Sequence, residues 1–311
     1  MGRALHACGL VLACLAWACN DTSFLDGKLC DPDHRCLPGY QCDPGSNRCL
    51  RELPPDGGDG QDGEDGDDGD GGVEVPEPIV LHRFLGEPAG GVFRDLAPLP
   101  PEVNLAAAPR EPVGLRYLED EVDLQGGRLE ASGEDSRALV EALLGAGSFS
   151  LEVWADPAAT VQRGPARIVT LSASHVDDGL GLGQEGNDLV GWVRSEASGP
   201  DANVSPLALL EQAFPAGRPR HMVLIYAGES GLGSLYVDGL LEDSSIHTVG
   251  EGAEARPALL DWNAESFTLG LGDEADGEHA WRGTVQRLAV WALPLDAAQA
   301  AKLYADGPGG P

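Results

Sequence analysis

Short apolar runs that alternate with polar or small residues fill most of the chain after residue 79. In residues 148–154, Phe149, Leu151 and Val153 fall on one face of an extended segment. Turns of Gly, Pro and Asp separate this run from similar runs at 167–171, 189–193, 221–226, 234–237, 267–271 and 284–291. A two-residue period predicts half-buried antiparallel strands, and many short strands in series predict an all-β sandwich or barrel.

One of the connections between these runs has a specific turn sequence. Asp238-Gly239 lies between two apolar segments. Asp and Gly tolerate the positive φ angles of a tight two-residue turn, so this dipeptide predicts a β-hairpin.

The apolar period changes near the end of the chain. Residues 296–306 have the pattern of a short helix, with Asp296 as N-cap and Gln299 as its capping-box partner. The helix is expected to end at Gly307, because glycine readily adopts the backbone conformation that ends a helix. We expect this helix to pack on the strands through Leu303.

The order of these segments resembles the laminin G-like, concanavalin A-like domains of bacterial surface proteins. The resemblance covers residues 79–307 and departs from the family at Gln286, where relatives usually carry Asp. It rests on LHRF at 81–84, GGVFRD at 90–95, SFSLEVW at 148–154, RHMVLIY at 220–226, LYVDG at 235–239, FTLG at 267–270, WRGTVQRLAVW at 281–291 and the capped helix.

What this resemblance implies is a jelly roll of two packed antiparallel sheets with a short C-terminal helix. Members of the family mostly bind glycans or proteins, in some cases with calcium at a loop edge. The resemblance does not assign a ligand, because function lies in sites that differ between proteins of one fold.

Acidic residues dominate the charge of the chain. The 311 residues include 51 acidic and 20 basic side chains, which gives a formal charge of −31. This surplus excludes nucleic acid and anionic membrane surfaces as partners, because phosphate groups are bound through Lys and Arg. Residues 79–311 carry 35 acidic and 15 basic side chains, a balance that favours cationic partners or Ca²⁺ over anionic ligands.

Residues 52–78 carry eleven acidic side chains, no basic one and many glycines. Glycine recurs every third residue from Gly57 to Gly72, as in collagen, but proline is absent from the other positions of these triplets. An EF-hand loop that starts at Asp65 would place Pro76 where a bidentate Glu is required. We therefore expect a disordered, extended acidic linker.

The first residues have the pattern of an export signal. Arg3 precedes an apolar stretch that ends in Ala16-Trp17-Ala18, so residues 1–18 are predicted to be a signal peptide. Cys19, directly after this site, resembles the acceptor cysteine of bacterial lipoproteins. We expect a lipoprotein anchored through Cys19 at the outer membrane or cell surface, and a secreted protein cleaved at the same bond is the alternative.

Residues 19–51 contain four further cysteines and few apolar side chains. Such a segment cannot form a core unaided, and two disulfides of Cys30, Cys36, Cys42 and Cys49 would each stabilise it by about 2–4 kcal/mol. Zinc is the rival interpretation, but these spacings lack the C-x2–4-C pairs of zinc sites. Of the three pairings, we favour Cys30–Cys42 with Cys36–Cys49.

Known catalytic motifs are incomplete in this sequence. Glu121 and Asp123 begin the E-x-D-x-x-E pattern of the retaining glucanases in the same superfamily, but Gly126 replaces the last acid. Residues 181–186 match G-x-G-x-x-G, yet a predicted strand follows where a dinucleotide site needs a helix, so we interpret this segment as a turn. The chain is therefore predicted not to be an enzyme.

One loop offers candidate metal ligands. Asp273, Asp276 and Glu278 lie between two predicted strands and would suit Ca²⁺, the only cofactor that the sequence suggests. A solvated acidic loop is the alternative. His221 alternates with apolar residues, so we expect it to pack within a strand and not to bind a metal.

Tryptophans are the candidate ligand-binding residues. Trp192, Trp262 and Trp281 would stack on sugar rings if they are exposed, although burial is the better expectation for each. Trp154 and Trp291 lie within predicted strands and are expected in the core.

The sequence therefore predicts a surface protein with a recognition domain. We expect the laminin G-like domain to bind glycans or extracellular proteins without catalysis, with membrane contact only through the lipid anchor. A glucanase-like hydrolase and a structural envelope protein without a ligand are the alternatives. The predicted order is a signal peptide at 1–18, an anchored cysteine-rich segment at 19–51, a linker at 52–78 and the jelly roll at 79–307.

Overall fold

The computed structural model describes residues 40–43, 48–51, 73–108, 114–174, 176–195, 206–215, 217–246, 259, 262–274, 277 and 279–310. Its chain divides into two compact units, Met1–Gly69 and Asp70–Pro311. In the first unit, strands β1 (Tyr40–Asp43) and β2 (Arg48–Arg51) pair antiparallel, with Cys42 opposite Cys49.

Several predictions fall on residues outside the described ranges. The signal peptide, lipidation of Cys19 and the disulfide partners Cys30 and Cys36 are among them, as are residues 52–72 of the linker. Their structural outcome stays a prediction.

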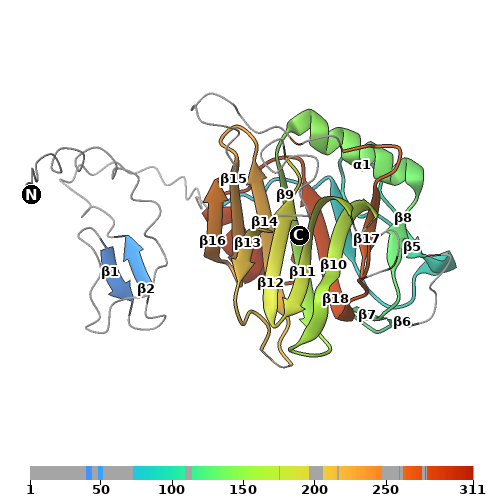
Figure 1. The fold of residues 1–311 in the computed structure, drawn as a ribbon, viewed down its shortest axis with the longest axis horizontal. Helices are drawn as coiled ribbons and strands as arrows, with labels where there is room; N and C mark the ends of the chain where they lie inside the picture. Colours follow the sequence, from blue (N-terminus) through green and yellow to red (C-terminus); the bar gives the residue numbers. More distant parts are fainter. Residues whose placement is uncertain are drawn as a thin grey trace, which may run out of the picture. The chain divides into compact units, whose positions relative to one another are not determined.

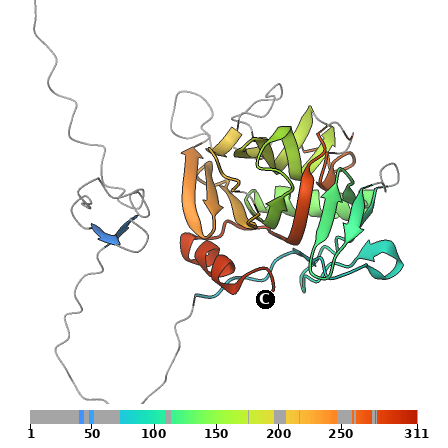
Figure 2. The same ribbon diagram turned by 90° about the horizontal axis from the view of Figure 1, so that it is seen from below.

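Two antiparallel sheets form a sandwich in the second unit, as the alternation predicts (Figures 1 and 2). The β10 sheet has the strand order β13-β12-β11-β10-β17-β8-β5-β4. Its strands are β4 (Val92–Phe93), β5 (Leu105–Ala107), β8 (Leu129–Ala131), β10 (Gln162–Ser174), β11 (Asp177–Gly186), β12 (Asp188–Val193), β13 (Pro206–Leu210) and β17 (Thr268–Leu271).

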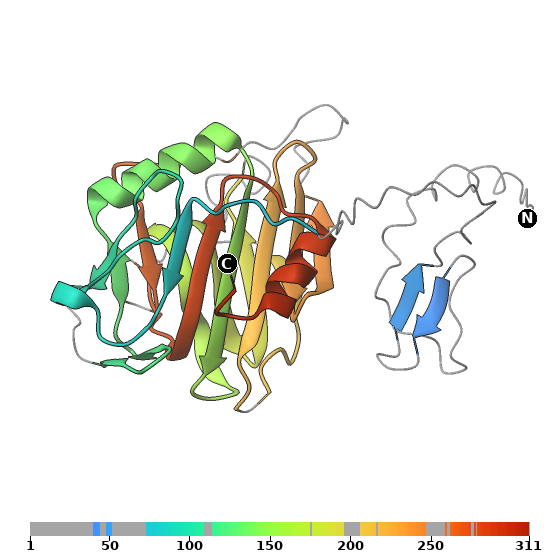
Figure 3. The same cartoon turned by 180° about the vertical axis from the view of Figure 1, so that it is seen from behind.

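The second layer, the β18 sheet, has the order β16-β15-β14-β9-β18-β7-β6, and β3 pairs with the second half of β18 (Figure 3). Its strands are β3 (Val80–Arg83), β6 (Leu115–Tyr117), β7 (Val122–Gln125), β9 (Phe149–Pro157), β14 (Arg220–Ala227), β15 (Leu232–Val237), β16 (Leu240–Ile246) and β18 (Arg282–Trp291). A 3-10 turn, η2 (Ala89–Gly91), precedes β4.

The inner faces of the two sheets form the main core. Phe149, Leu151 and Val153 of β9 are fully buried and meet Leu269 and Leu271 of β17 in one apolar cluster. Their alternation with polar residues is the pattern that predicted half-buried strands. The all-β sandwich is therefore confirmed.

One helix was not predicted from the sequence. Helix α1 (Gly133–Ala146) begins at the N-cap Ser132, whose side chain accepts a hydrogen bond from the backbone N–H of Asp135. Leu139 and Leu143 are buried in the main core, so α1 closes one end of the sandwich (Figure 1). Their i, i+4 spacing after a capping Ser is the signal that could have found this helix.

The C-terminal helix and its capping box are confirmed. Helix α2 (Ala297–Asp306) has Asp296 as N-cap, with reciprocal hydrogen bonds between Asp296 and Gln299. Leu303 packs in a second apolar cluster, and Figure 3 shows that α2 lies on the outer face of the β18 sheet. That cluster consists of Leu81, Val223, Ile225, Tyr236, Ala289, Trp291, Leu295, Ala300 and Leu303. No helix in the described ranges is long and apolar enough to cross a membrane.

The predicted hairpin joins β15 and β16. Asp238 and Gly239 have φ angles of 51° and 77°, which are the positive values of a two-residue hairpin turn.

Candidate functional site

A buried polar group, the Glu152 network, fixes the C-terminal segment to the β18 sheet. The carboxylate of Glu152 accepts hydrogen bonds from Trp154 Nε1 at 3.2 Å and Arg287 Nε at 2.9 Å, and His221 Nε2 lies 3.1 Å away. Arg287 also donates to the carbonyl oxygen of Gly310 at 2.7 Å. His221 thus packs within its strand, as predicted, and the network has a structural role.

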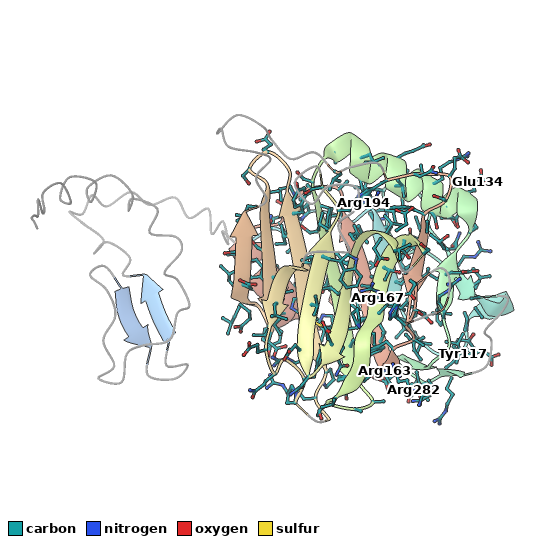
Figure 4. All side chains as sticks on the ribbon, in the orientation of Figure 1. Tyr117, Glu134, Arg163, Arg167, Arg194 and Arg282 are labelled. Atoms are coloured by element: carbon teal, nitrogen blue, oxygen red, sulfur yellow. The ribbon has the colours of Figure 1, made fainter. Side chains whose placement is uncertain are left out.

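A second buried group, the Arg167 network, lies on the outer face of the β10 sheet (Figure 4). The guanidinium of Arg167 contacts Asp178 through Nη2 at 2.7 Å and Glu274 through Nε at 3.2 Å. Glu274 in turn lies 2.8 Å from Nδ1 of His279. Both carboxylates are fully buried, so this network supports the sheet and offers no open face to a ligand.

Trp192 explains the glycines of the 181–186 segment. This segment lies within strand β11, so its interpretation as a turn is wrong. A Cβ atom on Gly181 would lie 2.4 Å from Trp192 Cζ2, and one on Gly183 would lie 3.1 Å from Cζ3. The indole lies flat on this glycine surface, and the Arg167 guanidinium lies 4.2 Å from the ring centroid. The glycines therefore make room for a side chain and not for a phosphate.

The three candidate tryptophans are buried and do not present a face to a sugar. Trp192 and Trp281 have no exposed surface and Trp262 has 4%. The indole N–H of Trp262 donates to the Arg194 carbonyl, and that of Trp281 donates to Gln184 Oε1. These tryptophans could stack on sugar rings only if they were exposed, and their burial excludes that role.

The proposed calcium ligands are only partly described. Asp273 is buried, and its Oδ1 accepts hydrogen bonds from the backbone N–H groups of Glu274 and His279, both at 2.9 Å. Asp276 and Glu278 lie outside the described residues. Among the residues that the structure describes, no group of three His, Cys, Asp or Glu side chains could hold a metal. Calcium binding stays a prediction.

A row of polar side chains crosses the outer face of the β18 sheet near the start of β18, outside the apolar cluster on which α2 packs. Thr284 of β18 is paired in register with Asp123 of β7 on one side and with Asp156 of β9 on the other. Neighbouring residues such as Val285 face the core, so these three side chains face outward. We call Asp123, Thr284 and Asp156 the Asp156 row.

The members of this row differ in their hydrogen bonding. Asp123 accepts from Gln125 Nε2 at 2.6 Å and lies 3.6 Å from the exposed Arg116 guanidinium. The hydroxyl of the half-buried Thr284 has no hydrogen-bond partner in the part of the chain that the structure describes. A half-buried hydroxyl between two carboxyl groups can both donate to a ligand and accept from it.

Asp156 differs electrostatically from an ordinary surface aspartate. Burial raises the pKa of its carboxyl group, and the negative charge of Glu121 raises that pKa further. Its Oδ1 is buried and lacks a hydrogen-bond partner among the described residues, which fits this loss of solvation. Asp156 therefore keeps its proton to a higher pH than an unperturbed aspartate does.

The structure changes the assignment of the carboxyl pair. In sequence, Glu121 and Asp123 resemble the first two acids of retaining glucanases, but Glu121 precedes β7 and its charge raises the pKa of Asp156. Asp123 and Asp156 lie two strands apart, which corresponds to about 10 Å between their backbones. No local motif joins these residues in the sequence, so only the strand register reveals the pair.

The family of the chain follows from its sequence and agrees with this fold. Residues 131–301 match the laminin G-type family model of the concanavalin A-like lectin/glucanases superfamily. This match covers more than half of the chain, and the protein belongs to that family. No curated protein sequence matches the chain.

Solved structures with the same fold include both an enzyme and a binding domain. The Trypanosoma rangeli sialidase in complex with sialic acid aligns with a TM-score of 0.52 and 18% identity, over 77% of this chain and 35% of that chain. The receptor-binding domain of the botulinum neurotoxin C/D mosaic serotype aligns with a TM-score of 0.52 and 8% identity, over 74% and 51%. This chain thus spans about a third of the sialidase chain and about half of the receptor-binding domain. At these sequence identities, the likeness shows the fold alone.

These neighbours overturn the prediction that the chain is not an enzyme. Trypanosoma rangeli sialidases are glycosidases, and they share this fold with a receptor-binding domain. The incomplete glucanase motif at Glu121 and Asp123 was therefore no ground for excluding catalysis. Within such a fold, activity depends on the side chains at the site.

Proposed function

We propose that this protein is an exported surface protein whose laminin G-like domain binds glycans through the Asp156 row. In this proposal, Cys19 carries the lipid anchor and residues 52–78 separate the domain from the membrane. The fold supports carbohydrate binding, since the family includes lectins and the solved neighbours include a sialidase bound to sialic acid.

The unpartnered hydroxyl of Thr284 is the observation that carries this proposal. Sugar hydroxyls each donate and accept hydrogen bonds, and a binding site for them needs a few fixed polar groups on an accessible surface. Asp123 and Asp156 hold carboxyl groups on both sides of this hydroxyl. Helix α2 packs on the outer face elsewhere, beside Tyr236 and Ile225 (Figure 3). Within the row, Thr284 and Asp156 are half-buried and Asp123 is 5% exposed.

Glycan binding is expected to depend on the Thr284 hydroxyl. The full chain, applied to an array of neutral and acidic oligosaccharides with and without Ca²⁺, is expected to bind a subset of them. Thr284→Val keeps the shape of the side chain and removes one hydrogen-bonding group, so the affinity for the bound oligosaccharides should fall about three- to tenfold. Array titrations or biolayer interferometry with the bound oligosaccharides would measure this change.

Thr268→Val is the matched control for this prediction. Thr268 is also half-buried on an outer sheet face, but it belongs to β17 in the β10 sheet. Its replacement should leave glycan affinity unchanged. Absence of any glycan binding, or equal losses in both variants, would contradict the proposed site.

The raised pKa of Asp156 favours glycoside hydrolysis as a second candidate function. Two carboxyl groups of different protonation state are the groups that glycosidases use as acid and base. Asp123 and Asp156 extend from the same face of the sheet, with about 10 Å between their backbones. Asp156, which keeps its proton to a higher pH, would serve as the acid and Asp123 as the base.

Hydrolysis by this pair would depend on Asp156 and on pH. The rate of reducing-sugar release from oligosaccharides should fall at least about 100-fold in Asp156→Asn, the usual size of a lost general acid. In the wild type the rate should decrease as the pH rises through the raised pKa, because only the protonated carboxyl can donate. Asp120→Asn, a change at an exposed neighbour, is the control. Release that persists in Asp156→Asn would rule out this role.

A further inference from the structure

The carbonyl oxygen of Gly310 accepts hydrogen bonds from two arginines on the outer face of the β18 sheet. Arg287 donates to it through Nη1 at 2.7 Å, and Arg83 donates to it through Nη2. These two arginines are paired in register on the neighbouring strands β18 and β3. Leu81 and Ala289, two residues away on the same strands, belong to the outer apolar cluster, so both arginines leave the sheet on its outer face. Their guanidinium groups therefore meet at a single oxygen atom.

Arg83 has no carboxylate partner among the residues that the structure describes. Most arginines in these ranges form an ion pair with Asp or Glu, and Arg287 does so with Glu152 at 2.9 Å. Arg83 is half-buried, and its Nε atom is buried without a hydrogen-bond partner in the described part of the chain. One positive charge of the arginine pair is therefore not compensated by an ion pair, at a place where water solvates it only in part.

Residues 307–310, which supply this carbonyl, are held through their backbone. They follow α2 on the outer face of the β18 sheet (Figure 3), and none of them belongs to either apolar cluster. The N–H of Gly307 donates to the carbonyl of Tyr304 at 3.2 Å, and that of Gly310 donates to the carbonyl of Gly307 at 3.0 Å. Displacement of residues 307–310 would break the contact of Arg287 with Gly310. It would leave the apolar clusters and the ion pair between Arg287 and Glu152 in place.

We propose that Arg83 and Arg287 form a binding site for a carboxylate ligand, and that residues 307–310 are its displaceable cover. A carboxylate brings two acceptor oxygens and a negative charge, so it matches two guanidinium groups better than one neutral carbonyl oxygen does. The Gly310 carbonyl thus occupies the position that a carboxylate oxygen of the ligand would take. This site is separate from the Asp156 row and does not depend on glycan binding there.

The overall negative charge of the domain does not oppose this local site. Charge beyond about 8–10 Å is largely screened at physiological ionic strength, so the groups near the site decide. Glu152 offsets the charge of Arg287, and that of Arg83 remains. Asp306, the acidic residue next to the cover, is bound to Lys302 Nζ at 2.9 Å. The sequence-based preference for cationic partners thus has a local exception at this site.

Gly310→Leu tests the cover, because a side chain at this position does not fit where the segment lies. A Cβ atom on Gly310 would lie 2.7 Å from Asp306 Cβ and 3.1 Å from the carbonyl oxygen of Gly307. A site that is rarely open has its apparent affinity reduced by the open fraction. The full-length Gly310→Leu variant should therefore bind D-glucuronate at least about tenfold more tightly than the wild type, measured by titration calorimetry. The affinity for D-glucose, which lacks the carboxylate, should not change.

Two further variants separate the cover from the arginine pair. Gly309→Leu is the matched control, since nothing lies within 4 Å of a Cβ atom at Gly309. It should leave the affinity for glucuronate at the wild-type value. Adding Arg83→Gln to Gly310→Leu should abolish the gain, because it removes the guanidinium charge that has no ion-pair partner.

Hydrogen exchange in the wild type tests the same inference without a substitution. Saturating glucuronate should speed exchange at the amide of Gly310, because a displaced cover loses the turn that this N–H closes. Unchanged exchange there, or a Gly310→Leu variant that binds glucuronate no more tightly than the wild type, would overturn the inference. A gain that survives Arg83→Gln would overturn it as well. None of these results bears on the Asp156 row, which the glycan array and Thr284→Val test separately.

Discussion

Glu152→Gln is expected to destabilise the protein by about 3–5 kcal/mol. The change removes a buried charge but keeps the size of the side chain, and Arg287 then loses the carboxylate that lies 2.9 Å from its Nε. Loss of one partner from a buried ion pair has a cost of this size, because the remaining charge cannot be solvated. Urea unfolding followed by circular dichroism would measure the difference in free energy.

Two further variants separate charge from packing in this network. Glu141→Gln changes an exposed glutamate of α1 and should shift the free energy of unfolding by less than about 0.5 kcal/mol. Adding Arg287→Met to Glu152→Gln removes the stranded charge and should recover part of the loss. A Glu152→Gln protein as stable as the wild type would show that the network does not hold the C-terminal segment.

Arg167→Met, a change in the β10 sheet, is expected to lower the free energy of unfolding by a similar amount. The variant removes the guanidinium that Asp178 and Glu274 share, and both carboxylates are fully buried. It also removes the cation above the Trp192 ring. We expect a decrease of about 3–5 kcal/mol in the free energy of unfolding, measured in urea.

Neutralising the two carboxylates should reverse much of this loss. The triple variant Arg167→Met/Asp178→Asn/Glu274→Gln has no buried charge at these positions, and it should be more stable than Arg167→Met alone. If the triple variant were the least stable of the set, the contribution of Arg167 would lie in packing and not in charge.

Much of the fold could be predicted from the sequence because its signals are local. The alternation of Phe149, Leu151 and Val153 predicted their burial, and Asp296 with Gln299 predicted the start of α2. Helix α1 was missed because its neighbours suggested an all-β pattern. The glycines of 181–186 could not be interpreted correctly, since the Trp192 ring that covers them comes from the next strand.

The candidate site depends on information that a single segment does not carry. Asp123, Asp156 and Thr284 come from three strands, and only the register of β18 with β7 and β9 brings them together. Nor does composition show which arginines lack a carboxylate partner. Among the described residues these are Arg83, Arg163 and Arg282, and only the ion pairs of the folded chain reveal them.

Hydrogen exchange with a bound sugar tests the central claim, glycan binding at the Asp156 row, most directly. Mass spectrometry would compare the full chain alone and with the array oligosaccharide that binds most tightly. The account predicts slower exchange in peptides that cover β7, the end of β9 and the start of β18, around Thr284. Slower exchange confined to β10, β11 and β12, with no change around Thr284, would contradict it.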